Sequence, residues 1–273
     1  MKLKIAVVQF RIRNYRPEEN LKRAEKFVER AKKSRANIVV FPEDFVTGPI
    51  EKRTMLADPK HEYRKFFQRL ARRHKIDVVP GSVIEKDSSK LHNTAYYIAS
   101  GGKVLSRYRK VNLWHPERKS FTPGRKVSVF GTRYGKVGLV ICWDLIFPEI
   151  FRKMAARGVE IVICPSYWLA GDAGVGLRHN PDAEVESVDS LCVGRAFENE
   201  IILVFCNAAG RPRTGKRTER LIGHSQIAVP FKGAVKRLPH NREAMFVQEV
   251  DTAILKDAER AYKIREDLKK RAR

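Results

Sequence analysis

The sequence predicts an α/β fold in which helices cover one face of a mixed sheet. Short apolar runs rich in β-branched residues, typical of buried strands, alternate with amphipathic helical segments along most of the chain. Further strand-like runs follow late in the chain, so strands occur both early and late with helices between them. The 273 residues suffice for a substantial core, built as one large domain or two small ones.

The elements of the first half alternate between apolar strands and one-sided helices. The helix at 17–34, for example, repeats its apolar residues on one face. The predicted elements are a strand at 3–10, a helix at 17–34, a strand at 37–41, a helix at 58–74, and strands at 77–84, 93–99, 103–108, 127–130 and 136–141.

The second half continues the same alternation and ends in a charged helix. A loop rich in Gly and Asp at 169–182 is of the kind that often lines binding sites. The predicted elements are a helix at 147–157, a strand at 160–164, a helix at 183–199, strands at 201–206, 223–230, 234–237 and 245–250, and a terminal helix at 252–268.

Two charged side chains follow the ends of predicted strands. Glu43 comes after Phe41 and Pro42, and Lys110 comes directly after the strand at 103–108. In open α/β sheets, ligands bind beyond the carboxyl ends of the strands. The simpler interpretations are a solvated loop acid and a surface lysine. Apolar neighbours favour partial burial, which would raise the pKa of Glu43 and suit it to act as a base.

Cys142 lies between a buried strand and a helix that Pro148 and Glu149 open, within the segment YGKVGLVICWDLIFPE at 134–149. Nucleophile elbows of hydrolases use this geometry, because a sharp bend holds the side chain out and places backbone N–H groups beside it. Alternatively, Cys142 is a buried small hydrophobic residue. This segment alone leaves both interpretations open.

The chain is strongly basic, with 55 Lys and Arg against 31 Asp and Glu and a net charge of +24. Such a field attracts polyanions and suggests a nucleic-acid or anionic-membrane partner. The alternative is a solvated basic surface. Because the charge is spread over several segments, without a nucleic-acid motif or interleaved aromatic residues, we favour the second interpretation.

The composition also bears on compartment and on metal binding. No apolar run approaches the ~20 residues that span a bilayer, and no signal peptide precedes the first strand, so we expect a cytoplasmic protein without a membrane partner. The seven histidines lack ligand spacing such as HExxH, and we therefore expect no metal and no metallohydrolase. The four cysteines, Cys142, Cys164, Cys192 and Cys206, are widely spaced, so we expect reduced thiols. Cys164 and Cys206 lie in strand-like apolar runs and are expected in the core.

Several motifs occur in a fixed order over nearly the whole chain. They are Phe41-Pro42-Glu43; Tyr108-Arg109-Lys110 with Asn112-Leu113; Glu117 ahead of Phe121 and Pro123-Gly124; Gly138 through Cys142-Trp143-Asp144 to Phe147-Pro148-Glu149; Arg195-Ala196, Glu198-Asn199 and Asn207; and Gly223, Ser225, Ile227 and Pro230. Each motif is weak alone. Together, in this order, they resemble the nitrilase superfamily of carbon–nitrogen hydrolases.

The resemblance implies a four-layer αββα sandwich in a single domain. Residues 1–252 would form the hydrolase domain, and 253–273 a charged helix and tail that packs on a partner subunit. It further implies homodimers that often build larger assemblies, and no cofactor. A terminal helix that is polar on all sides agrees with packing outside the core.

The resemblance also implies a Glu–Lys–Cys active site. Cys142 would attack an amide carbonyl and divide hydrolysis into acylation and deacylation, with Glu43 moving the protons. Lys110 and the backbone N–H of Trp143 would stabilise the oxyanion, while Glu117 orients the substrate and Lys110. Expected substrate-binding residues, besides Trp143, are Trp114, Tyr167 and Trp168.

The expected reaction is cleavage of a non-peptide C–N bond in a small linear amide or N-carbamoyl compound, through a thioester, with release of ammonia or an amine. Trp143-Asp144 resembles amidases and carbamoyl-amide hydrolases more than nitrilases, where Trp-Glu is usual; conversion of a nitrile to an acid and ammonia remains an alternative. Loops at 46–53, 114–119 and 167–177 would set specificity. The basic surface suggests the hypothesis of an anionic substrate.

Three rival interpretations concern other classes of protein. The first is a binding or scaffold protein with a vestigial site, which four filled catalytic positions argue against. The second is an acyltransferase that passes the thioester to an amine, although the chain lacks the membrane segments that lipid-directed relatives carry. The third is nucleic-acid binding, which would add to the enzyme interpretation and not replace it.

Overall fold

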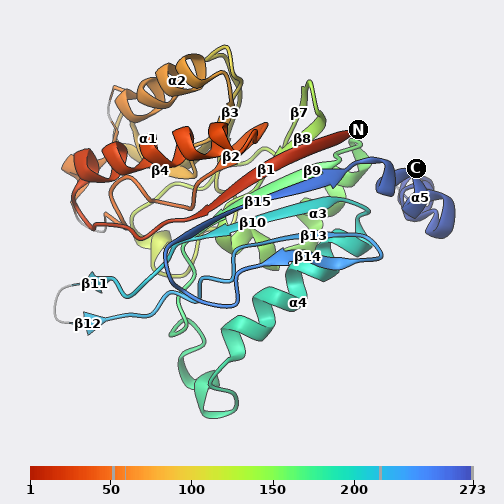
Figure 1. The fold of residues 1–273 in the computed structure, drawn as a ribbon. Coiled ribbons are helices and arrows are strands. Elements are labelled where there is room, and N and C mark those ends of the chain that lie inside the picture. The colour runs from red at the N-terminus through yellow and green to blue at the C-terminus, as the bar shows by residue number, and fades with distance from the viewer. Residues whose placement is uncertain (51–52, 59, 215–216, 272–273) are drawn as a thin grey trace.

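Two β-sheets pack face to face, and helices cover the outer face of each, as Figure 1 shows. The structure is a computed structural model that describes residues 1–50, 53–58, 60–214 and 217–271. Helices α1 (Pro17–Lys33) and α2 (Glu62–His74) lie on one side of the molecule in Figure 1, and α4 (Ala183–Glu198) lies on the opposite side. The expected four-layer αββα sandwich is confirmed.

The first sheet has seven strands, of which three adjacent ones are parallel. Its order is β15 (Ala244–Asp251), β1 (Lys2–Gln9), β2 (Ile38–Val40), β3 (Asp77–Val79), β5 (Lys90–Ile98) and β4 (Ser82–Asp87), with β6 (Val104–Arg109) also paired to β5.

The second sheet has six strands and the same plan, with β8, β9 and β10 parallel in its centre. Its order is β14 (Gly233–Arg237), β13 (Gln226–Val229), β10 (Ile202–Asn207), β9 (Ile161–Ser166), β8 (Gly135–Leu139) and β7 (Ser128–Thr132). A separate hairpin joins β11 (Arg213–Thr214) to β12 (Arg217–Thr218).

Both faces of β1 are buried, each against a different layer. Ile5 and Val7 pack in the cluster between the sheets, whereas Ala6 and Val8 pack in the cluster under α1 and α2. Successive side chains of a strand point to opposite faces, so one apolar run serves both layers. The expectation of a single mixed sheet with one covered face is therefore wrong: there are two sheets, each with helices on one face.

The predicted strand at 77–84 is two strands, β3 and β4. Pro80 and Gly81 separate them, and Gly81 has a φ of +59°. A Cβ at this glycine would lie 1.8 Å from the carbonyl oxygen of Pro42, so only glycine allows the two segments to approach. This bend brings the turn beneath the segment that carries Glu43.

Two predicted helices have different bounds. The helix expected at 58–74 begins at Glu62, because the Asp58 carboxylate accepts the N–H groups of Glu62 and Tyr63 at 2.7 and 3.0 Å. The terminal helix divides into α5 (Ala253–Tyr262) and α6 (Ile264–Arg271) at Lys263, whose φ is +53°.

Helix α6 is attached to its own chain. Arg265 of α6 donates hydrogen bonds to the carbonyl oxygens of Val159 and Glu200, at 2.8 and 2.5 Å. Helix α3 (Pro148–Ala156) lies beside it. The packing of residues 253–273 on a partner subunit stays a prediction, and 272–273 lie outside the described residues. None of the described helices has the length and apolar character required to cross a bilayer.

Candidate active site

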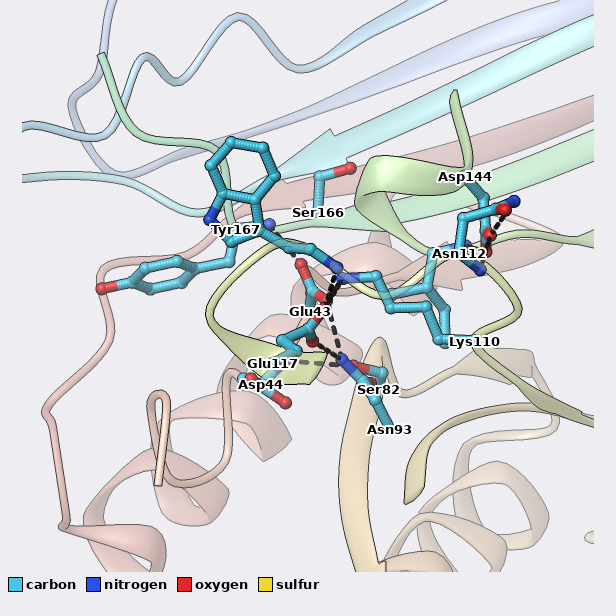
Figure 2. Close-up of polar contacts among 12 residues, drawn as sticks. Glu43, Asp44, Ser82, Asn93, Lys110, Asn112, Glu117, Asp144, Ser166 and Tyr167 are labelled. Atoms are coloured by element: carbon cyan, nitrogen blue, oxygen red, sulfur yellow. Dashed lines mark hydrogen bonds and ion pairs between the residues drawn. The ribbon is translucent and has the colours of Figure 1, made fainter. Parts of the chain in front are cut away.

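Side chains from both sheets meet in one cavity. Glu43 follows β2 and Lys110 follows β6 in the first sheet, whereas Cys142 and Tyr167 follow β8 and β9 in the second. Figure 2 shows Glu43 and Lys110 pointing toward each other, with Tyr167 on the side of the second sheet. The strand ends thus bring together groups that are up to 124 residues apart in the chain.

Cys142 occupies a sharp turn between strand and helix. Its φ is +46°, a value that residues with a side chain rarely adopt, and the turn continues as a short 3-10 helix at Cys142–Ile146 before α3. This geometry is that of the predicted elbow. The alternative of an ordinary core thiol is disfavoured, because Cys142 lines the cavity while Cys164, Cys192 and Cys206 are fully buried elsewhere. All four thiols are free.

The carboxylate of Asp144 stabilises the turn at Cys142 through hydrogen bonds. This carboxylate is buried, and burial raises its pKa. It accepts four hydrogen bonds of 2.7 to 2.9 Å, from the N–H groups of Ile141 and Asn112, the amide of Asn112 and the hydroxyl of Tyr108. Since Asp144 is not among the described residues that line the cavity, its contribution is to the shape of the turn.

Glu43 is the centre of the polar contacts. Its Oε1 accepts hydrogen bonds from Lys110 Nζ at 2.9 Å and Asn93 Nδ2 at 2.8 Å, and its Oε2 accepts the N–H of Tyr167 at 2.9 Å. Cys142 lines the same cavity, and the charge of this carboxylate acts on its thiol. The three donors fix the carboxylate in place, and Figure 2 shows Lys110, Asn93 and Tyr167 around it.

Lys110 lies between two carboxylates. Its Nζ is 2.9 Å from Glu43 Oε1 and 2.7 Å from Glu117 Oε2, and the residue is only 2% exposed. Glu117 is held in turn by the N–H of Trp114 at 2.6 Å and by Asn93 Nδ2 at 3.0 Å. A buried ammonium with two anionic partners stays charged.

Burial and charge shift the acidities of the three groups. Burial raises the pKa of Glu43, as expected, and the Glu117 charge adds to this while Lys110 opposes it. Burial alone would lower the pKa of Lys110, but Glu43 and Glu117 together raise it well above its ordinary value. Burial and the Glu43 charge raise the pKa of Cys142, against Lys110. The resting site therefore contains a neutral thiol, which needs a base before it can attack.

The cavity has a volume of about 520 Å³, and three indole rings contribute to its wall. Each of the expected substrate-binding residues lines it: Trp114, Trp143, Tyr167 and Trp168. Two ring contacts tie these indoles together, at centroid distances of 4.3 Å between Trp114 and Trp143 and 5.7 Å between Trp143 and Trp168.

All three predicted specificity loops contribute to the cavity. Examples are Ile50 from the first, Lys119 from the second and Leu169 from the third. Residues 51–52 of the first loop lie outside the described residues.

The sequence analysis missed four polar residues of the site: Asn93, Asp44, Asp172 and Glu219. Asn93 joins Glu43 to Glu117, and the other three line the cavity. Asn93 lies inside a strand and Glu219 follows a basic loop, so neither position carried a signal. Asp44 directly follows Glu43 and Asp172 lies in the Gly- and Asp-rich loop, and both positions could have been weighed.

A thiol on an elbow, beside a buried carboxylate and a buried ammonium, defines a class of protein suited to thiol-based acyl chemistry. The chain belongs to the carbon-nitrogen hydrolase family, whose sequence profile matches residues 4–260.

Proteins that are similar to this chain include an amidase and a member of the nitrilase superfamily. The 2-oxoglutaramate amidase of Bacillus subtilis is 27% identical over 274 residues, which cover 99% of each chain. The crystal structure of Nit3 from Saccharomyces cerevisiae, a member of branch 10 of the nitrilase superfamily, has a TM-score of 0.82 and 28% identity, covering 96% of this chain and 94% of that one.

One solved relative has been trapped on its cysteine. A mutant of the amidase from Nesterenkonia sp. AN1 carries the acetamide moiety of fluoroacetamide, covalently added at the active-site cysteine. It has a TM-score of 0.79 and 25% identity, and the match covers 97% of this chain and 96% of that chain.

Proposed function

We propose that this protein hydrolyses small linear amides or N-carbamoyl compounds through a thioester on Cys142. The observation that carries the proposal is the Glu43–Lys110 pair, joined at 2.9 Å and buried beside the Cys142 elbow. The amidases among its relatives support the same reaction class.

Acylation begins with proton transfer from the Cys142 thiol to Glu43, whose raised pKa suits it to this role. The thiolate forms a C–S bond to the amide carbonyl carbon, and the carbonyl oxygen becomes an oxyanion. Lys110 and the N–H of Trp143 stabilise that charge. The C–N bond then breaks as Glu43 returns the proton to the nitrogen, and ammonia or an amine leaves.

Deacylation repeats these steps with water. Glu43 takes a proton from the water, the resulting hydroxide attacks the thioester carbonyl, and the C–S bond breaks. The product acid leaves, and Cys142 recovers its proton from Glu43. Glu117 keeps Lys110 in place through its 2.7 Å contact and orients the substrate nitrogen.

The test is ammonia release from short amides by the wild-type protein and by Cys142→Ala. The variant should lose at least ~10³-fold in kcat/KM, because the acyl intermediate forms on the sulfur that the substitution removes. Its far-UV spectrum and Tm should stay close to those of the wild type. Residual turnover within tenfold of the wild type would refute Cys142 as the nucleophile.

The matched control is Cys192→Ala. Cys192 is a fully buried thiol on α4 and is not among the described residues that line the cavity. Its removal should lower stability by ~1 kcal/mol or less and leave turnover intact. Parallel assays with a nitrile and with an added amine acceptor separate nitrilase and acyltransferase activity from amide hydrolysis.

We further infer a cytoplasmic homodimer whose hydrolase domain is residues 1–252, with 253–273 as an appended helix and tail. An exposed aromatic group formed by Phe197, Phe231 and Tyr262 supports an interface between copies of the chain. Light scattering after size-exclusion chromatography measures the mass directly. A monomer at micromolar concentration would contradict this assignment.

A further inference from the structure

We propose that the substrate carries a positive charge at the end remote from its amide, and that Asp44, Asp172 and Glu219 bind this charge. The inference rests on the proposed function for the reaction at Cys142 and adds the chemical class of the substrate. All three carboxyl groups line the same cavity as the thiol.

Asp44 contributes to the cavity lining a carboxyl group with one unpartnered oxygen. It is 6% exposed, and its Oδ1 has no hydrogen-bond partner. Burying a polar group without a partner costs free energy. Proteins retain such costs at sites where a ligand supplies the missing contact.

Asp172, Glu219 and Asp44 line the cavity together with Tyr167. The charges of all three acids act on Tyr167, whose buried hydroxyl also lacks a hydrogen-bond partner. Asp172 is fixed by the N–H of Leu169, which donates to its Oδ2 at 3.1 Å. The lining of the cavity therefore contains these three acids and an unpaired hydroxyl.

The described lining offers little positive charge to balance these acids. Lys110 is engaged with Glu43 and Glu117, and Lys119 is exposed at the rim. None of the described cationic side chains forms an ion pair with Asp44, Asp172 or Glu219. The local field thus opposes the net charge of the molecule and disfavours the anionic substrate suggested by the basic surface.

A cationic ligand satisfies the acids and also fits the aromatic wall. Ammonium and guanidinium groups are attracted to the faces of indole rings, and Trp114, Trp143 and Trp168 border this cavity. Burial raises the pKa of Asp172 to about 7 and that of Asp44 well above its ordinary range. A bound cation would reverse both shifts by stabilising the charged carboxylates.

The experiment compares three amides of equal chain length: 5-aminopentanamide, hexanamide and adipamic acid. Their remote ends are cationic, neutral and anionic at pH 7.5. The cationic amide should have a kcat/KM at least ~10-fold above the neutral one, and the anionic amide should be the poorest substrate. A preference for adipamic acid, or equal rates for all three, would overturn the inference.

The Asp172→Asn variant tests whether the preference for the cationic amide depends on the carboxylate of Asp172. Asparagine keeps an oxygen for the N–H of Leu169 and removes the charge. The ratio of kcat/KM for 5-aminopentanamide to that for hexanamide should fall at least ~5-fold. Asp257→Asn makes the same charge change on α5, where the aspartate is 62% exposed, and should leave the ratio unchanged. An unchanged ratio in Asp172→Asn would show that Asp172 does not bind the positive charge of the substrate.

Binding to the inactive Cys142→Ala protein, followed by calorimetry, separates this inference from the proposed function. Tighter binding of 5-aminopentanamide than of hexanamide, without ammonia release by the wild type, would refute the hydrolase and keep the cation site. Turnover of all three amides, without tighter binding of the cation, would keep the hydrolase and refute the cation site.

Discussion

Asp44 shows at the scale of a single residue how this site stores unfavourable free energy. Burial raises its pKa, and the neighbouring Glu43 and Glu117 charges raise it further, against Lys110. The folded state thus prefers the protonated acid, whereas the unfolded chain ionises near the ordinary value of ~3.9. Such a group contributes stability below the unfolded pKa and loses it as the pH rises through the folded pKa.

We predict that Asp44→Asn stabilises the protein at neutral pH. Asparagine imitates the protonated acid, so the free energy of unfolding should rise by at least ~1 kcal/mol at pH 7.5, about 2 °C or more in Tm. At pH 4 the gain should nearly vanish. Urea unfolding at both pH values measures the difference. A loss of stability at pH 7.5 would mean that Asp44 is well accommodated as a carboxylate.

The positions after strands made the central groups candidates, and the family resemblance gave them their roles, but neither predicted their partners. Glu43, Lys110 and Cys142 could be found because each follows a strand, and the raised pKa of Glu43 followed from its apolar neighbours. Asn93 could not be found in this way. It lies within β5, and its contact with Glu43 depends on the pairing of β5 with other strands.

At the scale of elements, the turn between β3 and β4 supports the segment that carries Glu43. Pro80 and Gly81 end β3 and pass close to the carbonyl of Pro42, directly before the catalytic candidate. The sequence analysis predicted one continuous strand here, although Pro80-Gly81 is a dipeptide that marks turns. The close approach of a second backbone segment required the glycine, and a tertiary contact of that kind leaves no periodic signal.

We predict that Gly81→Ala destabilises the protein by more than ~3 kcal/mol and lowers amide turnover. An added Cβ would lie 1.8 Å from the Pro42 oxygen at a φ of +59°, so the backbone beneath Glu43 must move. Gly131→Ala in β7 is the control, because a Cβ there meets no atom within 4 Å. Thermal unfolding of both variants gives the comparison. Equal Tm values for the two variants would contradict this prediction, because they would show that the turn accommodates the added Cβ without loss of stability.

At the scale of the whole molecule, the two sheets have matching plans and divide the chemistry between them. Each has three central parallel strands, and the first supplies Glu43 and Lys110 while the second supplies Cys142. The apolar run of β1 indicated that both of its faces are buried, but it did not indicate which layer covers each face. The number of layers therefore followed from the family resemblance, and the composition and periodicity alone gave a single sheet.

The net charge of +24 also belongs to this scale, and its sign differs from that of most charged side chains in the described cavity lining. Basic residues dominate the composition, yet the described polar lining is rich in carboxyl groups, with Asp44, Asp172 and Glu219 beside Glu43 and Glu117. A mean charge describes the outer field that steers encounters. It does not describe the charge inside a cavity, which depends on the few side chains that line it.

The most direct measurement is mass spectrometry of the protein after acid quenching during turnover of hexanamide or 5-aminopentanamide. The account predicts a mass increase of one acyl group, located by peptide mapping on Cys142 and absent from Cys142→Ala. An acyl group on Cys164, Cys192 or Cys206, or steady turnover without an adduct on any cysteine under conditions where deacylation limits the rate, would contradict it.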